Sequence, residues 1–281
     1  MDLETILRFY GSNPWYGAVL IGILGLCVGS FLNVCIYRIP NKLSIRTPPS
    51  HCPDCKARLT ALDMVPVASW LFLGGKCRYC GKPISPRYML VELLTAAVFL
   101  LCWWRLPGLA SLIPALILAC VLITATFIDA EHTIIPNGLV LFGAVCGAVA
   151  VLITGLTGKP NPRWQDALLG ALAGGGPLLL IDVVSRLILR KDGMGGGDVK
   201  LMMMVGLFLG WQNTLLALVL AVVAGGLAGA VLLAAKVLKQ GDYFPFGPFL
   251  AAGSLASLLF GQDLLRLYAA FSDGIINRIA G

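Results

Sequence analysis

Charged residues are scarce in this chain: only 12% of its 281 residues are Asp, Glu, Lys or Arg, while 58% are hydrophobic. A soluble domain of this length has roughly a quarter of its residues charged. The apolar residues also come in runs of about 20, the length that crosses a bilayer as a helix. The scarcity of charge therefore excludes a soluble globular fold and predicts a membrane protein.

Several common catalytic patterns are missing. The chain has only two histidines and no HExxH pattern, so a zinc protease is unsupported. It has no GxSxG pattern for a serine hydrolase and no dinucleotide-binding glycine fingerprint. The basic residues that give the net charge of +7 are not spread as a nucleic-acid binder would need, so we expect no nucleic-acid partner.

The N-terminus lacks the positive segment of a cleaved signal peptide, because Asp2 and Glu4 stand in its place. We therefore expect the first apolar run to be retained. The apolar runs predict an all-α polytopic membrane protein with about eight transmembrane helices. They span residues 15–37, 89–106, 110–128, 138–156, 166–189, 199–210, 213–236 and 247–268. The sixth is short and follows a glycine-rich loop, so we expect it to begin below the membrane surface.

Glycines four residues apart recur inside these runs and predict close helix packing in lipid. The pairs are Gly25/Gly29, Gly143/Gly147, Gly170/Gly174, Gly206/Gly210 and Gly225/Gly229. The loops after the odd-numbered helices hold 15 of the 21 Lys and Arg residues, and the opposite side holds six. Because cytoplasmic loops carry the basic excess, we expect both termini outside and the large loop in the cytoplasm.

Four of the nine cysteines form two CxxC pairs, Cys52/Cys55 and Cys77/Cys80, in the polar segment 38–88. Four thiolates complete a tetrahedral shell with no open position, which predicts a structural zinc site in a small cytoplasmic loop domain between helices 1 and 2. A segment of about 50 residues lacks the core to fold unaided, and a metal supplies what is missing. The alternatives are redox CxxC motifs or two disulfides, although disulfides should not persist in the cytoplasm.

Four acidic residues lie in or beside the apolar runs, where charge is expensive and suggests function. They are Glu92, Asp129, Asp182 and Asp198. Asp129 ends the third run, and Asp198 follows the glycine-rich stretch before the sixth, so both are expected at the cytoplasmic ends of their helices. Two carboxylates at one depth can share one proton, as an aspartic protease requires. The alternative is that both are helix-end charges that contact headgroups or the nearby Lys191 and Lys200.

Together these motifs resemble the type IV prepilin peptidase family, and they occur in the family's order along most of the chain. The similar segments are Gly29–Pro40, both CxxC pairs, Arg87–Glu92, Asp129–Pro136, Gly195–Leu201 and Phe246–Phe249. The GxGD element alone is weak, because presenilin-like proteases share it, but the combination is specific. Two positions depart from the family pattern: Asn137 stands where many members have Asp, and Met89 replaces a frequent Pro.

The resemblance implies a bifunctional enzyme of the bacterial inner membrane. Its aspartate pair, here Asp129 and Asp198, would cleave the short basic leader of prepilin and pseudopilin precursors. The enzyme would then methylate the new N-terminal amine with S-adenosylmethionine. The implied division is 1–37 as first transmembrane helix, 38–88 as zinc loop linked to methylation, and 89–281 as seven-helix peptidase core. Our candidates for the S-adenosylmethionine site are Asn33, Arg38, Gly75, Lys76 and Glu92.

Two other functions are compatible with parts of the pattern. A polytopic transporter could use the membrane acidic residues as ion ligands, although no long internal repeat is present. A non-enzymatic scaffold could dock other machinery through the zinc loop. The full order of motifs favours the enzyme, with precursor proteins and membrane lipid as its partners.

Overall fold

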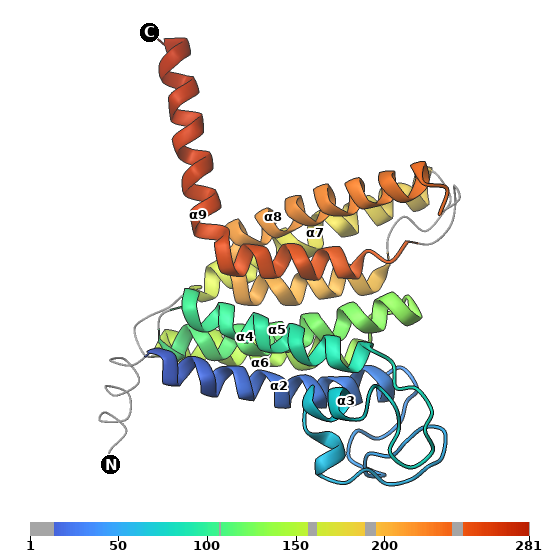
Figure 1. Ribbon diagram of the computed structural model, residues 1–281. Coiled ribbons are helices and arrows are strands. Elements are labelled where there is room, and N and C mark those ends of the chain that lie inside the picture. Colours follow the sequence, from blue (N-terminus) through green and yellow to red (C-terminus); the bar gives the residue numbers. More distant parts are fainter. Residues whose placement is uncertain (1–13, 107, 157–161, 189–194, 238–243, 281) are drawn as a thin grey trace. The chain divides into compact units, whose positions relative to one another are not determined.

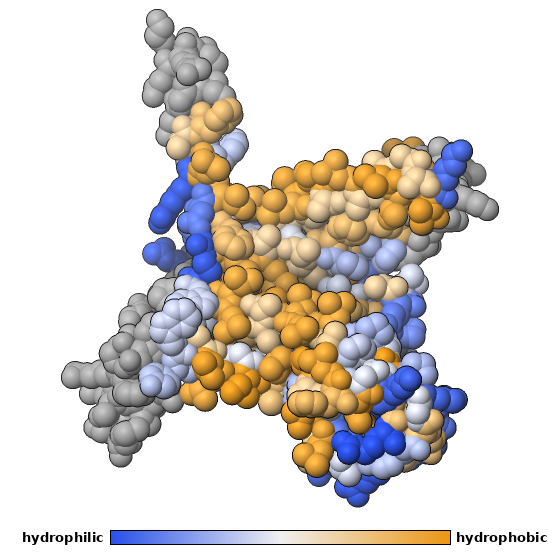
Figure 2. Space-filling model, in the orientation of Figure 1, coloured by the Kyte–Doolittle hydropathy of each residue, from blue (hydrophilic) through white to orange (hydrophobic). Residues whose placement is uncertain are grey.

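The computed structural model describes residues 14–106, 108–156, 162–188, 195–237 and 244–280. Within these ranges every regular element is a helix, and the strand-like pairing consists of two isolated β-bridges. Seven of the described helices are long and apolar enough to cross a membrane. The predicted all-α polytopic fold is therefore confirmed. Figure 2 shows the apolar side chains that cover the outer faces of these helices.

The chain forms two compact units, and the first is Met1–His132. Its long helices are α2 (Pro14–Arg38), α4 (Arg87–Arg105) and α5 (Leu109–His132), and its loop contains the short helices η1 (Leu62–Met64) and α3 (Ala68–Phe72). A β-carbon on Gly25 would lie 2.6 Å from Cα of Ala96, and one on Gly29 would lie 2.7 Å from Cα of Glu92. The α2 and α4 backbones therefore meet at this glycine pair, as its spacing predicts.

The second unit, Thr133–Gly281, contains α6 (Asn137–Leu156), α7 (Trp164–Ile188), α8 (Gly196–Ala234) and α9 (Gly247–Ala280), labelled in Figure 1. Helices α7 and α8 touch through glycine: a β-carbon on Gly170 would strike the carbonyl oxygen of Gly206. Gly147 of α6 lies similarly against Phe208 of α8. By contrast, a β-carbon on Gly229 would meet no atom within 4 Å, so this glycine packs against no described neighbour.

Helix α8 contains a chain reversal. Its 39 residues are helical except at Gly210, where φ is 71° and ψ is 173°. A β-carbon on Gly174 would touch both the carbonyl oxygen of Met202 and, at 3.0 Å, Cγ2 of Thr214. Twelve residues of straight helix would separate those two residues by about 18 Å. Residues 196–209 and 211–234 are therefore two arms that lie side by side (Figure 1).

The two arms correspond to the runs 199–210 and 213–236, predicted as the sixth and seventh membrane helices. Counting α8 as one helix gives seven candidate spans, and counting its arms gives the eight expected from sequence. The positive φ explains why the reversal falls on a glycine, since a side chain there would be strained. Residues 1–13 of the predicted first segment, and Gly193 of the glycine-rich stretch, lie outside the described residues.

Candidate functional site

The four predicted cysteines form a cluster that could hold a metal ion. Their sulfur atoms all lie within 4.8 Å of one another, and the sulfurs of Cys52 and Cys80 are 4.0 Å apart. Tetrahedral zinc bound at about 2.3 Å by four sulfurs places them slightly less than 4 Å apart. The cluster thus fits the ion with a small contraction. His51, the other nearby candidate ligand, instead has its Nδ1 atom 2.9 Å from the carbonyl oxygen of Pro49.

The two CxxC turns have the same backbone structure. In the first, the N–H of Lys56 donates to the carbonyl of Cys52, and the N–H of Cys52 donates to the carbonyl of Ala57. In the second, Gly81 and Lys82 occupy the equivalent positions around Cys77. Each turn holds its two sulfurs on one side, so the pair of turns supplies two halves of one shell.

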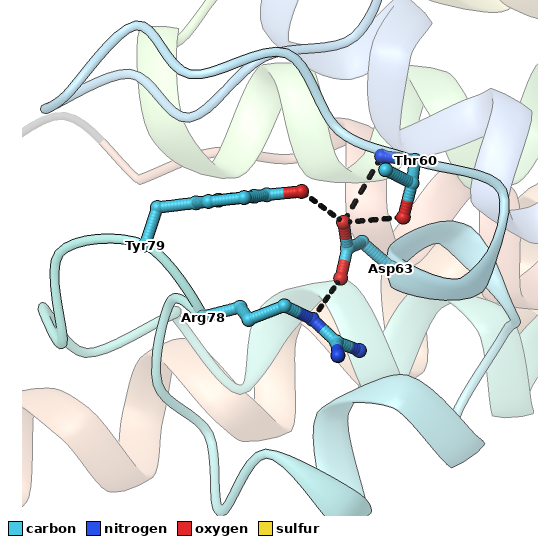
Figure 3. Close-up of polar contacts among 4 residues, drawn as sticks. All are labelled: Thr60, Asp63, Arg78 and Tyr79. Atoms are coloured by element: carbon cyan, nitrogen blue, oxygen red, sulfur yellow. Dashed lines mark hydrogen bonds and ion pairs between the residues drawn. The ribbon is translucent and has the colours of Figure 1, made fainter.

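Side-chain contacts join the second turn to residues 60–63 (Figure 3). The Asp63 carboxylate accepts hydrogen bonds from the backbone N–H and the hydroxyl of Thr60, from Arg78 Nε at 2.7 Å and from the Tyr79 hydroxyl at 2.9 Å. Only 3% of this side chain is exposed. These donors, led by the Thr60 backbone, hold the pKa of Asp63 well below its usual range. Asp63 is thus an anionic hub that fixes the second turn.

A second ion pair links the turns directly. Lys82 Nζ, just after Cys80, lies 2.6 Å from Asp54 Oδ1, between Cys52 and Cys55. Asp54 raises the pKa of Lys82 by this contact. Both side chains are well exposed, so solvent screens the pair and it contributes little to stability. The buried Asp63 hub is therefore the stronger organising contact.

A cavity of about 510 Å³ lies in the first unit between α2, the start of α4 and the loop. Its lining includes Asn33, Arg38 and Glu92, three of the five cofactor candidates, and it does not include Gly75 or Lys76. The volume is in the range of small-molecule sites. Its walls also include Trp70 and Tyr88.

The three lining candidates differ in what they bind. Arg38 donates from its two terminal nitrogens to the carbonyls of Ser44 at 2.8 Å and Pro48 at 2.7 Å, which shapes the loop. Asn33 donates from Nδ2 to the carbonyl of Tyr88 at 3.0 Å, while its buried Oδ1 has no partner. Such an unpaired buried acceptor calls for an explanation, and a donor on a bound ligand would supply one.

Glu92 joins the cavity to the loop. Its Oε2 accepts a 2.7 Å hydrogen bond from the backbone N–H of Val67, the residue before α3. Val67 has a φ of 61°, which is strained for a β-branched side chain. The carboxylate of Glu92 therefore holds the loop in a conformation that its sequence disfavours.

Gly75 and Lys76 lie behind the cavity wall. A β-carbon on Gly75 would lie 2.9 Å from Cζ2 of Trp70, and the N–H of Gly75 donates to the carbonyl of Trp70 at 2.8 Å. Trp70 Nε1 in turn donates to the carbonyl of Ile84 at 3.2 Å. Lys76 pairs with Pro83 in an isolated bridge. Gly75 therefore contacts the cavity wall through Trp70, whereas Lys76 pairs with the residue before Ile84, which accepts the Trp70 bond.

Asp129 lies near the end of α5 and is 2% exposed. Two residues later, Glu131 forms an ion pair with Arg87, the first residue of α4. The guanidinium of Arg87 also lies 5.2 Å from the ring centroid of Tyr88. Because Arg87 follows the loop directly, this ion pair places Asp129 at the same end of the first unit as the cysteine cluster and the cavity.

Asp198 lies in the first turn of α8 and is 5% exposed. Its N–H donates to the carbonyl of Gly195 at 2.9 Å. A β-carbon on Gly197 would lie 2.9 Å from Cβ of Ile135, whereas one on Gly196 would meet no atom within 4 Å. Lys200 donates to Asn137 Oδ1. The glycines thus let the start of α8 approach the segment before α6.

Asp129 belongs to the first unit and Asp198 to the second, and each is described within its own unit. Asp182, left open by the sequence, forms a two-point ion pair with Arg186, one turn away on α7, at 3.0 and 3.1 Å. Sequence reasoning missed the Asp63 hub and the wall residues Trp70 and Tyr88. The available signal was the apolar run Val65–Leu73, which contains Trp70 and interrupts the polar segment.

Two family models match the chain. Residues 23–106 match the bacterial peptidase A24 N-terminal domain, and residues 116–230 match the type IV leader peptidase family. No solved structure matches.

Several curated proteins are similar over most of their length. The chain is 36% identical to the prepilin leader peptidase/N-methyltransferase of Aeromonas hydrophila, with 95% of this chain and 98% of that protein covered. It is 35% identical to the protein of that name from Bacillus subtilis, with 91% of this chain and 99% of that protein covered. The Myxococcus xanthus protein of that name is 39% identical, with 78% and 64% covered.

Proposed function

The chain belongs to the type IV leader peptidase family, and we propose on that premise that it cleaves the leaders of type IV prepilins and pilin-like secretion proteins and then N-methylates the new N-terminal residue. The observation that supports this proposal most directly is the similarity to prepilin leader peptidase/N-methyltransferases along nearly the whole chain. It includes both the N-terminal region and the peptidase region. No observation favours a transporter.

Asp129 and Asp198 are the proposed catalytic pair, supported by their burial at helix ends. Two adjacent carboxylates share one proton, because like charges at short range cannot both ionise. One carboxylate takes a proton from the attacking water, whose oxygen bonds to the scissile carbonyl carbon, while the other protonates the carbonyl oxygen. The C–N bond then breaks as the amine nitrogen takes the first proton, and the resulting hydroxyl proton returns to the second carboxylate.

The proposed site faces the cytoplasm of the bacterial inner membrane, with both termini outside. Its support is the charge of the segment 38–88, which holds nine Lys and Arg residues and only two Asp residues. Cytoplasmic loops carry such an excess. The Arg87–Glu131 ion pair ties the end of α5 to this segment, so Asp129 would be at the cytoplasmic face with it.

Zinc is the metal that the cysteine cluster fits best, because four thiolates at tetrahedral spacing favour this ion. Cys52, Cys55, Cys77 and Cys80 would fill its shell and leave no position for a substrate. Its role would therefore be to fold the segment 38–88, whose side chains form most of the cavity wall. The functional division into 1–37, 38–88 and 89–281 follows from this assignment.

The cavity in the first unit is the proposed site of S-adenosylmethionine, which supplies an electrophilic methyl group on a positively charged sulfur. The fit rests on the cavity's volume, its aromatic walls and two groups suited to that ligand. The unpaired Oδ1 of Asn33 can accept from an amino group, and the Glu92 carboxylate can attract a positive charge. Arg38 would hold the loop that closes the cavity, and Gly75 with Lys76 would position Trp70.

Methylation also needs a neutral amine, because an ammonium has no lone pair to attack with. Glu92, which lies on the membrane-spanning helix α4 and lines the cavity, could accept the proton that the amine releases. Its second oxygen would remain bonded to the N–H of Val67. A peptide amine arriving after cleavage could thus be held and methylated at the same end of the unit that presents Asp129.

Mass spectrometry tests both activities at once. Purified protein in liposomes is incubated with a prepilin peptide, with and without S-adenosylmethionine. We expect loss of the leader in both samples and a gain of one methyl group only with S-adenosylmethionine. An intact peptide in both samples, from protein that retains its metal and its fold, would contradict the proposal.

A further inference from the structure

The loop carries an apolar surface that nothing in the proposed chemistry uses. Phe72 is 90% exposed and Leu71 is 58% exposed, at the end of α3. Leu62 and Val65, just before α3, are exposed as well. We call these four residues the α3 patch. Figure 2 shows that the loop domain has hydrophobic as well as hydrophilic surface. Leu71 and Phe72 are neighbours in the chain, and an exposed apolar patch marks an interaction site.

The two sides of α3 differ. Ser69, Trp70 and Leu73 line the cavity, while Leu71 and Phe72 point away from it and are exposed. The short helix is therefore a wall with a polar and aromatic inner side and an apolar outer side. An interfacial helix has this arrangement, with its apolar face among lipid acyl chains.

The depth of α3 follows from its bond to α4. Val67 donates to Glu92, which lies five residues beyond Arg87, the start of α4. Five helical residues advance about 7.5 Å along the axis. α4 already exposes Leu90 at 55%, and then Leu93, so its lipid-facing surface begins before the depth of Glu92. The start of α3 therefore lies at a depth where α4 already exposes large apolar side chains.

The charge of the loop also favours lipid as the partner of the α3 patch. The segment 38–88 has nine basic and two acidic residues, so its excess of seven positive charges equals the net charge of the chain. Anionic headgroups attract basic segments next to a membrane helix. Lipid is thus complementary to the apolar patch and to the net positive charge of the segment that carries it.

We propose that the α3 patch inserts into the cytoplasmic leaflet, with Leu71 and Phe72 among the acyl chains, and that α3 thereby separates the cavity from the lipid. The proposal concerns a lipid-binding surface and does not depend on either enzymatic activity. A second copy of the chain and the second unit of the same chain are the other possible occupants, and the experiment below distinguishes all three.

Photo-crosslinking in the full-length protein tests the proposal. The photoreactive residue p-benzoyl-phenylalanine replaces Phe72 in protein reconstituted into phosphatidylethanolamine/phosphatidylglycerol liposomes, and mass spectrometry identifies the adducts after irradiation. Phe142, exposed on the membrane-spanning helix α6, is the positive control. Arg46, exposed on the loop, is the negative control. If the Phe72 variant does not accumulate, the same replacement at Leu71 carries the same expectation.

We expect phospholipid adducts at position 72 with a yield within about threefold of that at Phe142, because both side chains would contact acyl chains. The yield at Arg46 should be several-fold lower. Three results would overturn the proposal: a yield at position 72 no higher than at Arg46, a cross-linked dimer as the main product, or a cross-link to residues 133–281 as the main product.

Discussion

Lys200 Nζ donates a hydrogen bond to Asn137 Oδ1, 2.9 Å away, and so joins the first turn of α8 to the first turn of α6. Gly197 packs against Ile135 on the adjoining segment. Asp198 lies between these two contacts in the chain. The backbone that presents its carboxylate is therefore fixed from both sides, as a group that must meet a partner in defined geometry requires.

Gly197→Ala should impair cleavage, because the added methyl group would lie 2.9 Å from Cβ of Ile135 and displace the start of α8. A displacement of about 1 Å at a catalytic group can cost about a hundredfold in rate. Peptide cleavage by the purified variant gives the measurement. Gly196→Ala is the matched control, since its methyl group meets nothing within 4 Å. Ile135→Gly in the Gly197→Ala background removes the β-carbon that the methyl group would strike, and should restore activity; failure to do so would refute the packing explanation.

Asp129→Asn and Asp198→Asn should each abolish leader cleavage while the protein stays inserted and folded. Each carboxylate performs half of one proton-transfer sequence, and removing a positioned acid or base costs on the order of 10²–10⁴ in rate. Leader loss by mass spectrometry is the readout. Asp182→Asn is the matched control, a buried acid paired with Arg186, and should retain cleavage. Near-normal turnover by either of the first two variants would eliminate the pair.

The purified protein should contain one zinc ion, measurable by elemental analysis of protein prepared without chelator. Serine at any of Cys52, Cys55, Cys77 or Cys80 should release it, because serine is a poor zinc ligand at neutral pH. Methylation should then be lost, whereas leader cleavage should persist at least in part. Cys146→Ser in α6 should keep the metal. Wild-type protein without zinc would contradict the assignment.

Asp63→Asn should loosen the loop without touching a metal ligand. The amide removes the charge and turns an NH₂ donor toward groups that themselves donate, which costs about 1–3 kcal/mol. The variant should lose zinc to a chelator at lower concentration than wild type. Asp54→Asn removes only the exposed pair with Lys82, so this variant should lose zinc at a chelator concentration close to that for wild type. Equal effects of the two variants would show that Asp63 has no special role.

Glu92→Gln should separate the two activities. The amide oxygen can still accept from the N–H of Val67, so the loop should keep its shape, but the negative charge is lost. We expect methylation to fall at least about tenfold, as for loss of a general base, with cleavage nearly unchanged. Calorimetric titration with S-adenosylmethionine tells whether binding or proton removal is affected. Unchanged methylation and unchanged binding would exclude Glu92 from that site.

Much of the fold could be predicted from the sequence because the bilayer restricts it. Apolar runs must become helices when no water is available to their backbone, and the predicted runs agree with α2 and α4 to within two residues at each end. The two halves of α8 were also expected as separate runs. The sequence did not indicate that the two arms are joined at Gly210 without a loop between them, because a reversal of so few residues leaves little trace in hydropathy.

The metal cluster was predictable for a different reason, namely that CxxC spacing dictates a turn. The cavity was harder to predict from the sequence. Its walls depend on contacts between distant residues, such as Val67 with Glu92 and Trp70 with Ile84. No short-range pattern encodes these pairs, which explains why Gly75 and Lys76 were named as candidates while their neighbour Trp70 was not.

The reversal at Gly210 decides whether the chain crosses the membrane an even or an odd number of times. Each arm of α8 that crosses the bilayer changes the side on which the chain continues, so the seven long helices of the described residues, one of them with an internal turn, would make an even number of crossings. Reporter domains fused to the two ends of the protein should consequently report the same compartment. A fusion placed between the two arms should report the opposite compartment from one placed after residue 237. One glycine thereby decides on which side of the membrane the C-terminal helix begins.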